Sequence, residues 1–252
     1  IDFSEISSIG FSGQTVFHTN KMSFQIGDPK FIAKETNIDV YSDFRNYDIK
    51  NGGLGAPLIP VFHKYIYSEK NTNKLVFNIG GIANGTYLQN EKVSLASDVG
   101  PGNCLIDYFM KKNFGKPFDN LGKEAMKGEI DISLLQRLLS KCSDMKYPRA
   151  DDKKAYYNLI DNSFDKVDPN SLLRTLTEFT ATKIIEFYKF CKKPGDVIFH
   201  GGGTKNLFLM SIIENKIGKV RTTDDEIPSK YFEAAAFAYL AYLKKGEIYL
   251  SK

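Results

Sequence analysis

Short apolar runs separated by polar turns dominate the first hundred residues. The strands expected from them are residues 6–10, 15–19, 23–26, 38–44, 74–79, 85–88 and 93–98. Asp28-Pro29 opens a short helix among them, since proline favours the first helical position. A turn over residues 80–84 joins the strands at 74–79 and 85–88. Together with 93–98 they predict a compact three-strand unit.

Helical periodicity becomes prominent in the rest of the chain. Apolar residues recur at helical spacing after the turn 100–103, and a long helix is expected from Pro169 to about residue 194. The strands and helices expected beyond it alternate: a strand at 197–199, a helix at 206–213, a strand at 220–222 and a helix at 233–243. This alternation predicts an α/β fold, in which ligands bind where strands lead into helices.

Composition and charge narrow the classes of function. With 252 residues, 42% hydrophobic and 25% charged, the chain is expected to fold around a sizeable core. Its net charge of +4 is spread along the sequence, which argues against a nucleic-acid partner. The longest apolar stretch, 234–243, is far shorter than the ~20 residues of a membrane span, so no membrane partner is expected. Three widely spaced cysteines favour a reducing cytoplasm.

Three glycine turns are the candidates for ligand binding. They cover residues 78–81, 98–103 and 201–203, the last followed by Asn206. None is a complete phosphate-loop or dinucleotide fingerprint, and each alone is compatible with an ordinary chain reversal. Their order is more specific, because a glycine-bent hairpin is followed by a strand that ends in an aspartate, a glycine turn and a helix. This order resembles the phosphate-binding units of actin-like ATPases and sugar kinases.

Further motifs make the resemblance more specific, and the chain resembles the anhydro-N-acetylmuramic acid kinase family from Ile9 to about Leu243. The matching segments are residues 9–16, 25–28, 43–48, 52–63, 78–81, 98–107, 118–122, 178–181, 201–210, 222–224 and 233–238.

The resemblance implies a two-lobed actin-like ATPase fold, related to ribonuclease H. The first lobe would cover residues 1–66 and the second 67–252, with the last helix free to pack back on the first lobe. It also implies a cytoplasmic homodimer that uses ATP and Mg²⁺ in peptidoglycan recycling. Such an enzyme opens the 1,6-anhydro bridge of anhydro-N-acetylmuramic acid with water and phosphorylates O6, giving N-acetylmuramic acid 6-phosphate.

Site residues carry over where the motifs match. Asp98 corresponds to the catalytic base that takes a proton from water, and no residue corresponds to a metal ligand. The expected sugar-binding residues are Glu233, Arg45, Asp48 and Gln14. The expected nucleotide- and phosphate-binding residues are Asn78, Gly80, Gly81, Gly100, Gly102, Asn103, Gly201, Gly202, Gly203 and Asn206.

Structural roles are the alternatives for several of these residues. Asp98 could cap the following turn, and Glu233 could favour a helix start through the helix dipole. Arg45 and Asp48 could form a surface ion pair worth ~0–1 kcal/mol. The three histidines lack the spacing of metal ligands and are expected to be structural.

The chain also departs from the family pattern. Ser12 and Leu54 stand where the family usually has histidine and glutamine, and residues 147–157 align poorly with a lysine- and arginine-bearing segment. The chain starts without methionine, and the phosphate hairpin of the first lobe is missing, so that lobe is expected to be incomplete and the chain alone a poor kinase. The alternatives are another actin-like phosphotransferase or hydrolase, and a degenerate or truncated, non-catalytic sugar- or nucleotide-binding protein.

Overall fold

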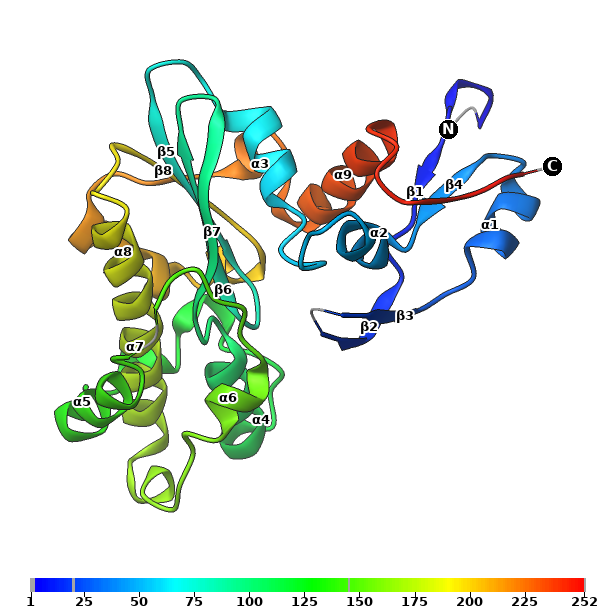
Figure 1. Ribbon diagram of the computed structural model, residues 1–252. Coiled ribbons are helices and arrows are strands. Elements are labelled where there is room, and N and C mark those ends of the chain that lie inside the picture. Colours follow the sequence, from blue (N-terminus) through cyan, green and yellow to red (C-terminus); the bar gives the residue numbers. More distant parts are fainter. Residues whose placement is uncertain (1–2, 20, 145, 252) are drawn as a thin grey trace. The chain divides into compact units, whose positions relative to one another are not determined.

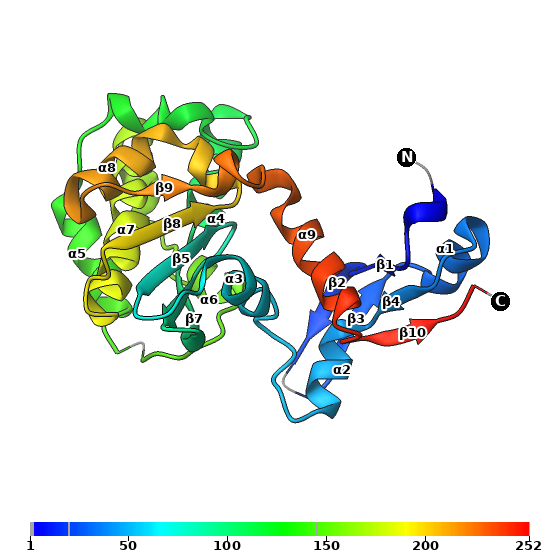
Figure 2. The same cartoon turned by 90° about the horizontal axis from the view of Figure 1, so that it is seen from above.

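The computed structural model describes residues 3–19, 21–144 and 146–251, which fold as two compact units. Unit 1 combines Ile1–Ile66 with Tyr231–Lys252, and unit 2 is Tyr67–Lys230. The last 22 residues, placed in the second lobe on sequence grounds with the option of packing back, thus group with the first 66. Figure 1 labels most elements of both units, and Figure 2 labels the last two strands as well.

Unit 2 is built on a five-stranded sheet. Its strands, in spatial order, are β7 (Lys92–Gly100), β6 (Ala83–Gln89), β5 (Asn73–Ile79), β8 (Asp196–His200) and β9 (Arg221–Thr222). The first three are antiparallel neighbours, whereas β8 runs parallel to β5 and β9 parallel to β8. The compact three-strand unit and the α/β class expected from the sequence are therefore confirmed.

One long helix, α7 (Pro169–Phe190), contributes side chains to both apolar clusters of unit 2. Its N-terminus is fixed by Asp168, whose side chain accepts a hydrogen bond from the Ser171 amide at 3.0 Å, and by Pro169 at the first position. Ile184 and Phe187 pack against the sheet, while Phe179 belongs to a second apolar cluster with α4 (Cys104–Phe114) and α5 (Ile132–Lys141). Figures 1 and 2 both show α7 beside α8. The helices of unit 2 are α4 (Cys104–Phe114), α5 (Ile132–Lys141), α6 (Lys153–Tyr157), α7 (Pro169–Phe190) and α8 (Leu207–Ile217).

Unit 1 holds a three-stranded sheet and a separate hairpin. The sheet has the order β1 (Ile9–Gly10), β4 (Val40–Ser42) and β10 (Glu247–Tyr249), and the hairpin pairs β2 (Gln14–His18) with β3 (Ser23–Ile26). The other elements are α1 (Pro29–Thr36), α2 (Phe44–Lys50), most of α3 (Pro60–Tyr67) and most of α9 (Ser229–Tyr242).

Several boundaries differ from those expected. The strand expected over residues 38–44 ends at Ser42, because Asp43 adopts a left-handed conformation (φ 51°) and the chain turns into α2. The last helix begins at Ser229 instead of residue 233, and the first strand is only Ile9–Gly10. Helices α2, α3 and α6 and strand β10 were not expected, since each is short and depends on packing more than on its own periodicity. Helix α5 was not expected either, although its apolar residues recur at helical spacing.

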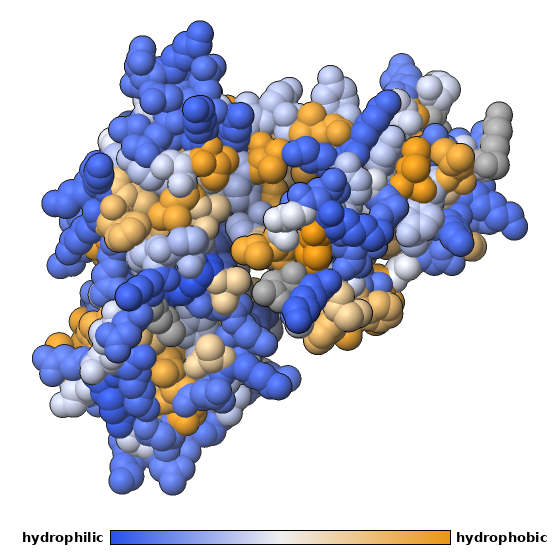
Figure 3. Space-filling model, in the orientation of Figure 1, coloured by the Kyte–Doolittle hydropathy of each residue, from blue (hydrophilic) through white to orange (hydrophobic). Residues whose placement is uncertain are grey.

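The hairpin of unit 1 exposes an apolar patch, visible over β2 and β3 in Figure 3. Its exposed large side chains are Val16, Phe17, Met22, Phe24 and Ile26. No helix in the described ranges combines the length and the apolar character that crossing a membrane requires.

A buried hydroxyl on α7 ties the core of unit 2 to one of the glycine turns. Thr180 Oγ1 donates to the Gly102 carbonyl at 2.7 Å, whereas Thr177 Oγ1 donates to Leu173 in the preceding turn of its own helix. We expect Thr180→Val to lower the free energy of unfolding by about 1–3 kcal/mol, because a buried carbonyl loses its donor. Thr177→Val is the matched control and should cost less, measured by urea denaturation. Equal losses would contradict a special role for Thr180.

Candidate active site

Three glycine turns of unit 2 meet at the ends of neighbouring strands. The Asn103 amide donates to the Gly80 carbonyl at 2.9 Å, and the Cys104 amide donates to the Gly81 carbonyl at 3.0 Å. The Asn103 side-chain amide adds a bond to the Gly80 carbonyl at 3.2 Å. The turn after β7 is thus bonded directly to the turn between β5 and β6, and both lie where β8 leads into its own glycine turn.

The close approach of these turns requires glycine. A Cβ on Gly102 would lie 2.5 Å from the Gly80 carbonyl oxygen, and one on Gly203 would lie 2.2 Å from Ile79 Cγ2. Gly201 has φ 92°, and a Cβ there would lie 2.3 Å from Asn78 Oδ1. At Gly202, by contrast, a Cβ would meet no atom within 4 Å, because this residue faces open space.

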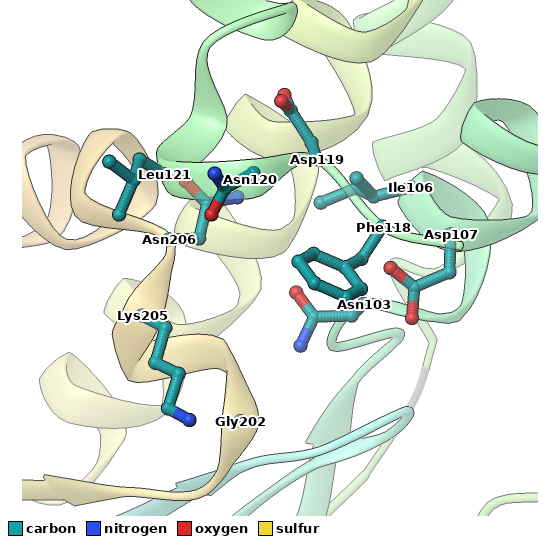
Figure 4. Close-up of a pocket in the computed structure, with 10 residues that line it drawn as sticks. All are labelled: Asn103, Ile106, Asp107, Phe118, Asp119, Asn120, Leu121, Gly202, Lys205 and Asn206. Carbon is teal, nitrogen blue, oxygen red and sulfur yellow. The ribbon is translucent and has the colours of Figure 1, made fainter. Parts of the chain in front are cut away.

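That open space is a cavity of about 520 Å³ (Figure 4). Its lining residues are Asn103, Ile106, Asp107, Phe118, Asp119, Asn120, Leu121, Gly202, Lys205 and Asn206. Sequence reasoning had assigned three of them, Asn103, Gly202 and Asn206. The Phe118-Asp119 pair lay within a matching segment but had no role, and its spacing alone carried no signal for a ligand.

The lining residues divide into those that shape the cavity and those that face it. Asp119 points away in Figure 4, and its two oxygens each accept an amide hydrogen bond at 2.9 Å, from Glu124 and Ala125. Asn206 Oδ1 accepts from the Leu209 amide at 3.0 Å and so caps α8. The apolar side chains of Ile106, Phe118 and Leu121 thus lie among several polar groups, a mixture that suits a nucleoside.

Asp107, on the first turn of α4, contributes an acidic group to the cavity. Burial raises its pKa to about 6, an effect that the nearby Lys153 ammonium opposes. Lys153 also lies over the hairpin turn, since a Cβ on Gly81 would be 2.8 Å from Lys153 Nζ. The ammonium group therefore stands where a phosphate held by this turn would need a counter-charge.

Asp98 lies on β7, opposite Asn84 of β6 and two residues before Gly100. Its Oδ2 accepts a hydrogen bond from the Asp151 amide at 2.7 Å, and its own amide donates to the Arg149 carbonyl at 2.9 Å. Burial raises the pKa of Asp98 to about 6, while the Asp151 amide and the Arg149 charge act in the opposite direction. A carboxylate with this pKa can accept a proton near neutral pH.

The neighbours of Asp98 come from the segment that aligned poorly with the family. Arg149 and Asp151 form an ion pair at 2.9 Å, and both side chains are about nine-tenths buried. No sequence signal singled them out, because they become neighbours of Asp98 only when residues 147–151 fold back onto β7.

The four expected sugar-binding residues all belong to unit 1. Arg45 donates to the Gly55 carbonyl at 2.9 Å, and Asp48 Oδ2 accepts from the Gly55 amide at 2.8 Å. Both thus hold the glycine-rich loop after α2, so a surface ion pair is not needed to explain them. Burial lowers the pKa of Arg45, and the charge of Glu233 raises it.

Arg45 and Glu233 share a small recess, whereas Gln14 is exposed and neither it nor Asp48 lines that recess. The recess measures about 30 Å³, which is room for a water molecule and not for a sugar. Ser12, the departure from the family histidine, also lines it, and Leu54 is exposed. Binding of a sugar by these four residues stays a prediction.

The sequence model of anhydro-N-acetylmuramic acid kinases matches residues 1–248. The chain belongs to this family. An anhydro-N-acetylmuramic acid kinase from Shewanella frigidimarina is 38% identical over 94% of this chain and 68% of its own length. Another from Shewanella amazonensis is 37% identical over 96% of this chain and 69% of its own length. The family expected from the motifs is therefore confirmed.

Among solved structures, similarity is weaker. The activator of the 2-hydroxyisocaproyl-CoA dehydratase from Clostridium difficile, with bound ADPNP, matches with a TM-score of 0.49 at 16% identity. The match covers 75% of this chain and 65% of that one.

Gly202 offers a clean test of the cavity as a nucleotide site. Because a side chain fits there without clashes, Gly202→Val should fold and fill part of the cavity, weakening ATP binding about tenfold or more. Gly195→Val is the matched control, since a Cβ there also meets no atom within 4 Å. Calorimetry should detect the loss for Gly202→Val alone. Unchanged ATP affinity in a folded Gly202→Val protein would make the turn purely structural.

Proposed function

We propose that this protein is an ATP-dependent kinase that opens 1,6-anhydro-N-acetylmuramic acid and forms N-acetylmuramic acid 6-phosphate in peptidoglycan recycling. The observation that carries the proposal is the family match over residues 1–248. A partly buried carboxylate, Asp98, with a pKa of about 6 beside a cluster of glycine turns supports it.

In this reaction Asp98 acts as the general base. A water molecule attacks the anomeric carbon of the sugar while its proton passes to Asp98 Oδ1, because Oδ2 already accepts the Asp151 amide. The bond from the anomeric carbon to O6 breaks, and O6 keeps the electron pair. O6 then attacks the γ-phosphorus of ATP, and the bond to the departing ADP oxygen breaks. The sum is one anhydro sugar, one water and one ATP consumed for one sugar 6-phosphate, one ADP and one proton, which Asp98 releases to solvent.

The nucleotide is assigned to the glycine turns and the cavity of unit 2. The phosphates would lie against the backbone at Gly80, Gly81 and Gly201, where the absence of side chains allows close contact and Lys153 supplies positive charge. The nucleoside would occupy the cavity beside Phe118 and Gly202.

Magnesium is proposed to enter with ATP, bound to its phosphates. Within the described residues no group of three or more His, Cys, Asp and Glu side chains is arranged to hold a metal ion. Mg²⁺ is commonly coordinated by phosphate oxygens and water, because it keeps several of its waters when bound. The ion would offset phosphate charge during transfer.

A second candidate function is that of a non-catalytic sugar- or nucleotide-binding protein. The loss of the usual histidine at Ser12, beside Arg45 and Glu233, favours it. Incubation with the anhydro sugar and ATP distinguishes the two, with mass spectrometry for the 6-phosphate and a coupled assay for ADP. Equal amounts of both products support the kinase. Binding of both ligands without products would support the alternative.

The homodimer and the cytoplasmic location stay predictions of the family resemblance. Light scattering coupled to gel filtration should give twice the 28.4 kDa chain mass. A mass equal to that of one chain would refute the dimer.

Asp98→Asn should lower turnover about 10²–10⁴-fold, because the amide cannot accept the proton, while ATP affinity stays near that of the parent. In the parent, the raised pKa means that the ionised base is lost as pH falls through about 6, so kcat/KM should fall about tenfold per unit below that value. The measurement is a pH series of initial rates.

Asp107 is the control for this pH dependence, because burial raises its pKa to about 6 as well. Asp107→Asn should keep the acidic limb of the profile. Loss of that limb in Asp107→Asn, or more than about a tenth of parental turnover in Asp98→Asn, would remove Asp98 from the role.

Glu233→Ala should weaken binding of the anhydro sugar and lower turnover, since a carboxylate beside Arg45 is suited to a sugar hydroxyl. Nucleotide affinity should not change. Glu35→Ala, an exposed glutamate on α1 of the same unit, is the control and should alter neither. Calorimetric titration with each ligand decides the matter, and a selective loss of ATP affinity would reverse the assignment.

A further inference from the structure

The segment around Arg149 encloses Asp98 from two sides. The Asp98 amide donates to the Arg149 carbonyl at 2.9 Å, and the Asp151 amide donates to Asp98 Oδ2 at 2.7 Å. Ser97 Oγ accepts from the Arg149 amide at 2.9 Å, which fastens the segment one residue earlier on β7. The carboxylate of Asp98 is therefore held in one orientation, with Oδ1 left for another partner.

The side chains of the same segment form a network that uses Nε and one terminal nitrogen of Arg149, whereas the other terminal nitrogen, Nη1, is buried without a hydrogen-bond partner among the described residues. Arg149 Nε donates to Asp151 Oδ2 at 2.9 Å, and the Tyr156 hydroxyl donates to the same oxygen. Another guanidinium nitrogen of Arg149 donates to the Val99 carbonyl, and the guanidinium lies 5.2 Å from the centre of the Tyr147 ring. Opposite charges that are buried together in this way stabilise each other only as a pair.

We propose that Arg149 and Asp151 are positioning residues that aim the Asp98 carboxylate and balance its charge, a role that rests on the proposed function of Asp98 as the base. The pair touches Asp98 through backbone and charge and needs no contact with substrate. It differs from the expected site residues, none of which lies in this segment.

The electrostatic part of the role has a definite sign. Asp151 raises the pKa of Asp98 because two negative charges repel, and Arg149 lowers it because it attracts the ionised form. Among the residues that the structure describes, these are the charged groups that act on Asp98, and its cross-strand neighbour Asn84 is neutral. If only one of the two charges is removed, the remaining charge acts on Asp98 without opposition. If both are removed, their opposite effects on the pKa of Asp98 disappear together.

The experiment follows the titration of Asp98 directly in single and double variants. Aspartate carboxyl carbons are labelled with ¹³C, the Asp98 signal is identified by its loss in Asp98→Asn, and its chemical shift is followed against pH. Arg149→Met should move the midpoint up by about one unit, and Asp151→Asn should move it down by a similar amount. The double variant should return toward the parent value. The acidic limb of kcat/KM should move in parallel.

Matched variants separate this role from general structural damage. Asp152→Asn removes the adjacent acid, and since asparagine caps helix α6 as well as aspartate does, it should leave the midpoint unchanged. Arg149→Lys should keep most of the parental midpoint by retaining the charge. If Arg149→Met does not fold, Tyr156→Phe is the smaller perturbation. It should move the Asp98 midpoint up, because Asp151 stays ionised beside Arg149 but loses the hydroxyl group that partly offsets its negative charge.

The outcomes decide the proposal independently of the enzymatic function. Midpoints that stay constant, or that move in the same direction in both single variants, would overturn it. Failure of the parent to form any 6-phosphate would refute the proposed function, while the carboxyl titration would still show whether the pair sets the state of Asp98.

Discussion

Direct contact between backbones is the constraint on which unit 2 depends. The turn after β7 can bond to the turn between β5 and β6 only because Gly102 lets its backbone come within reach of the Gly80 carbonyl. Thr180 of α7 then satisfies the Gly102 carbonyl from the core side. The contact between Gly102 and Gly80 therefore connects the sheet, the long helix and the start of α4. The cavity lined by Gly202 stays open beside it.

The partial burial of the Asp98 carboxylate beside these turns lowers the stability of the fold. Asp98 ionises less readily than a solvated aspartate, and its pKa of about 6 means that the folded chain binds a proton more tightly than the unfolded chain does. Ionised Asp98 thus destabilises the fold above about pH 6, and this destabilisation is relieved as pH falls toward the ordinary value. A pKa shifted by burial is typical of catalytic groups, whose function requires a pKa near the working pH.

The two units use glycine in different ways. In unit 2, glycines at positions 102, 201 and 203 allow turns to approach one another, whereas in unit 1 Gly55 supplies an amide and a carbonyl to Asp48 and Arg45. Side chains that the family resemblance linked to the sugar thus also serve to hold a loop. A loss of function on changing them would need a separate measurement of folding.

The sequence by itself determined the strands β5 to β8, the start of α7 at Asp168-Pro169, the glycine turns and the family, because these depend on local periodicity, capping and ordered motifs. Only the tertiary structure decided what surrounds them. Asp151 lies 53 residues from Asp98 in the chain, and the cavity draws on Phe118 and Lys205 from separate segments. Such contacts arise from long-range packing of side chains that have no shared spacing, so no local pattern could have revealed them.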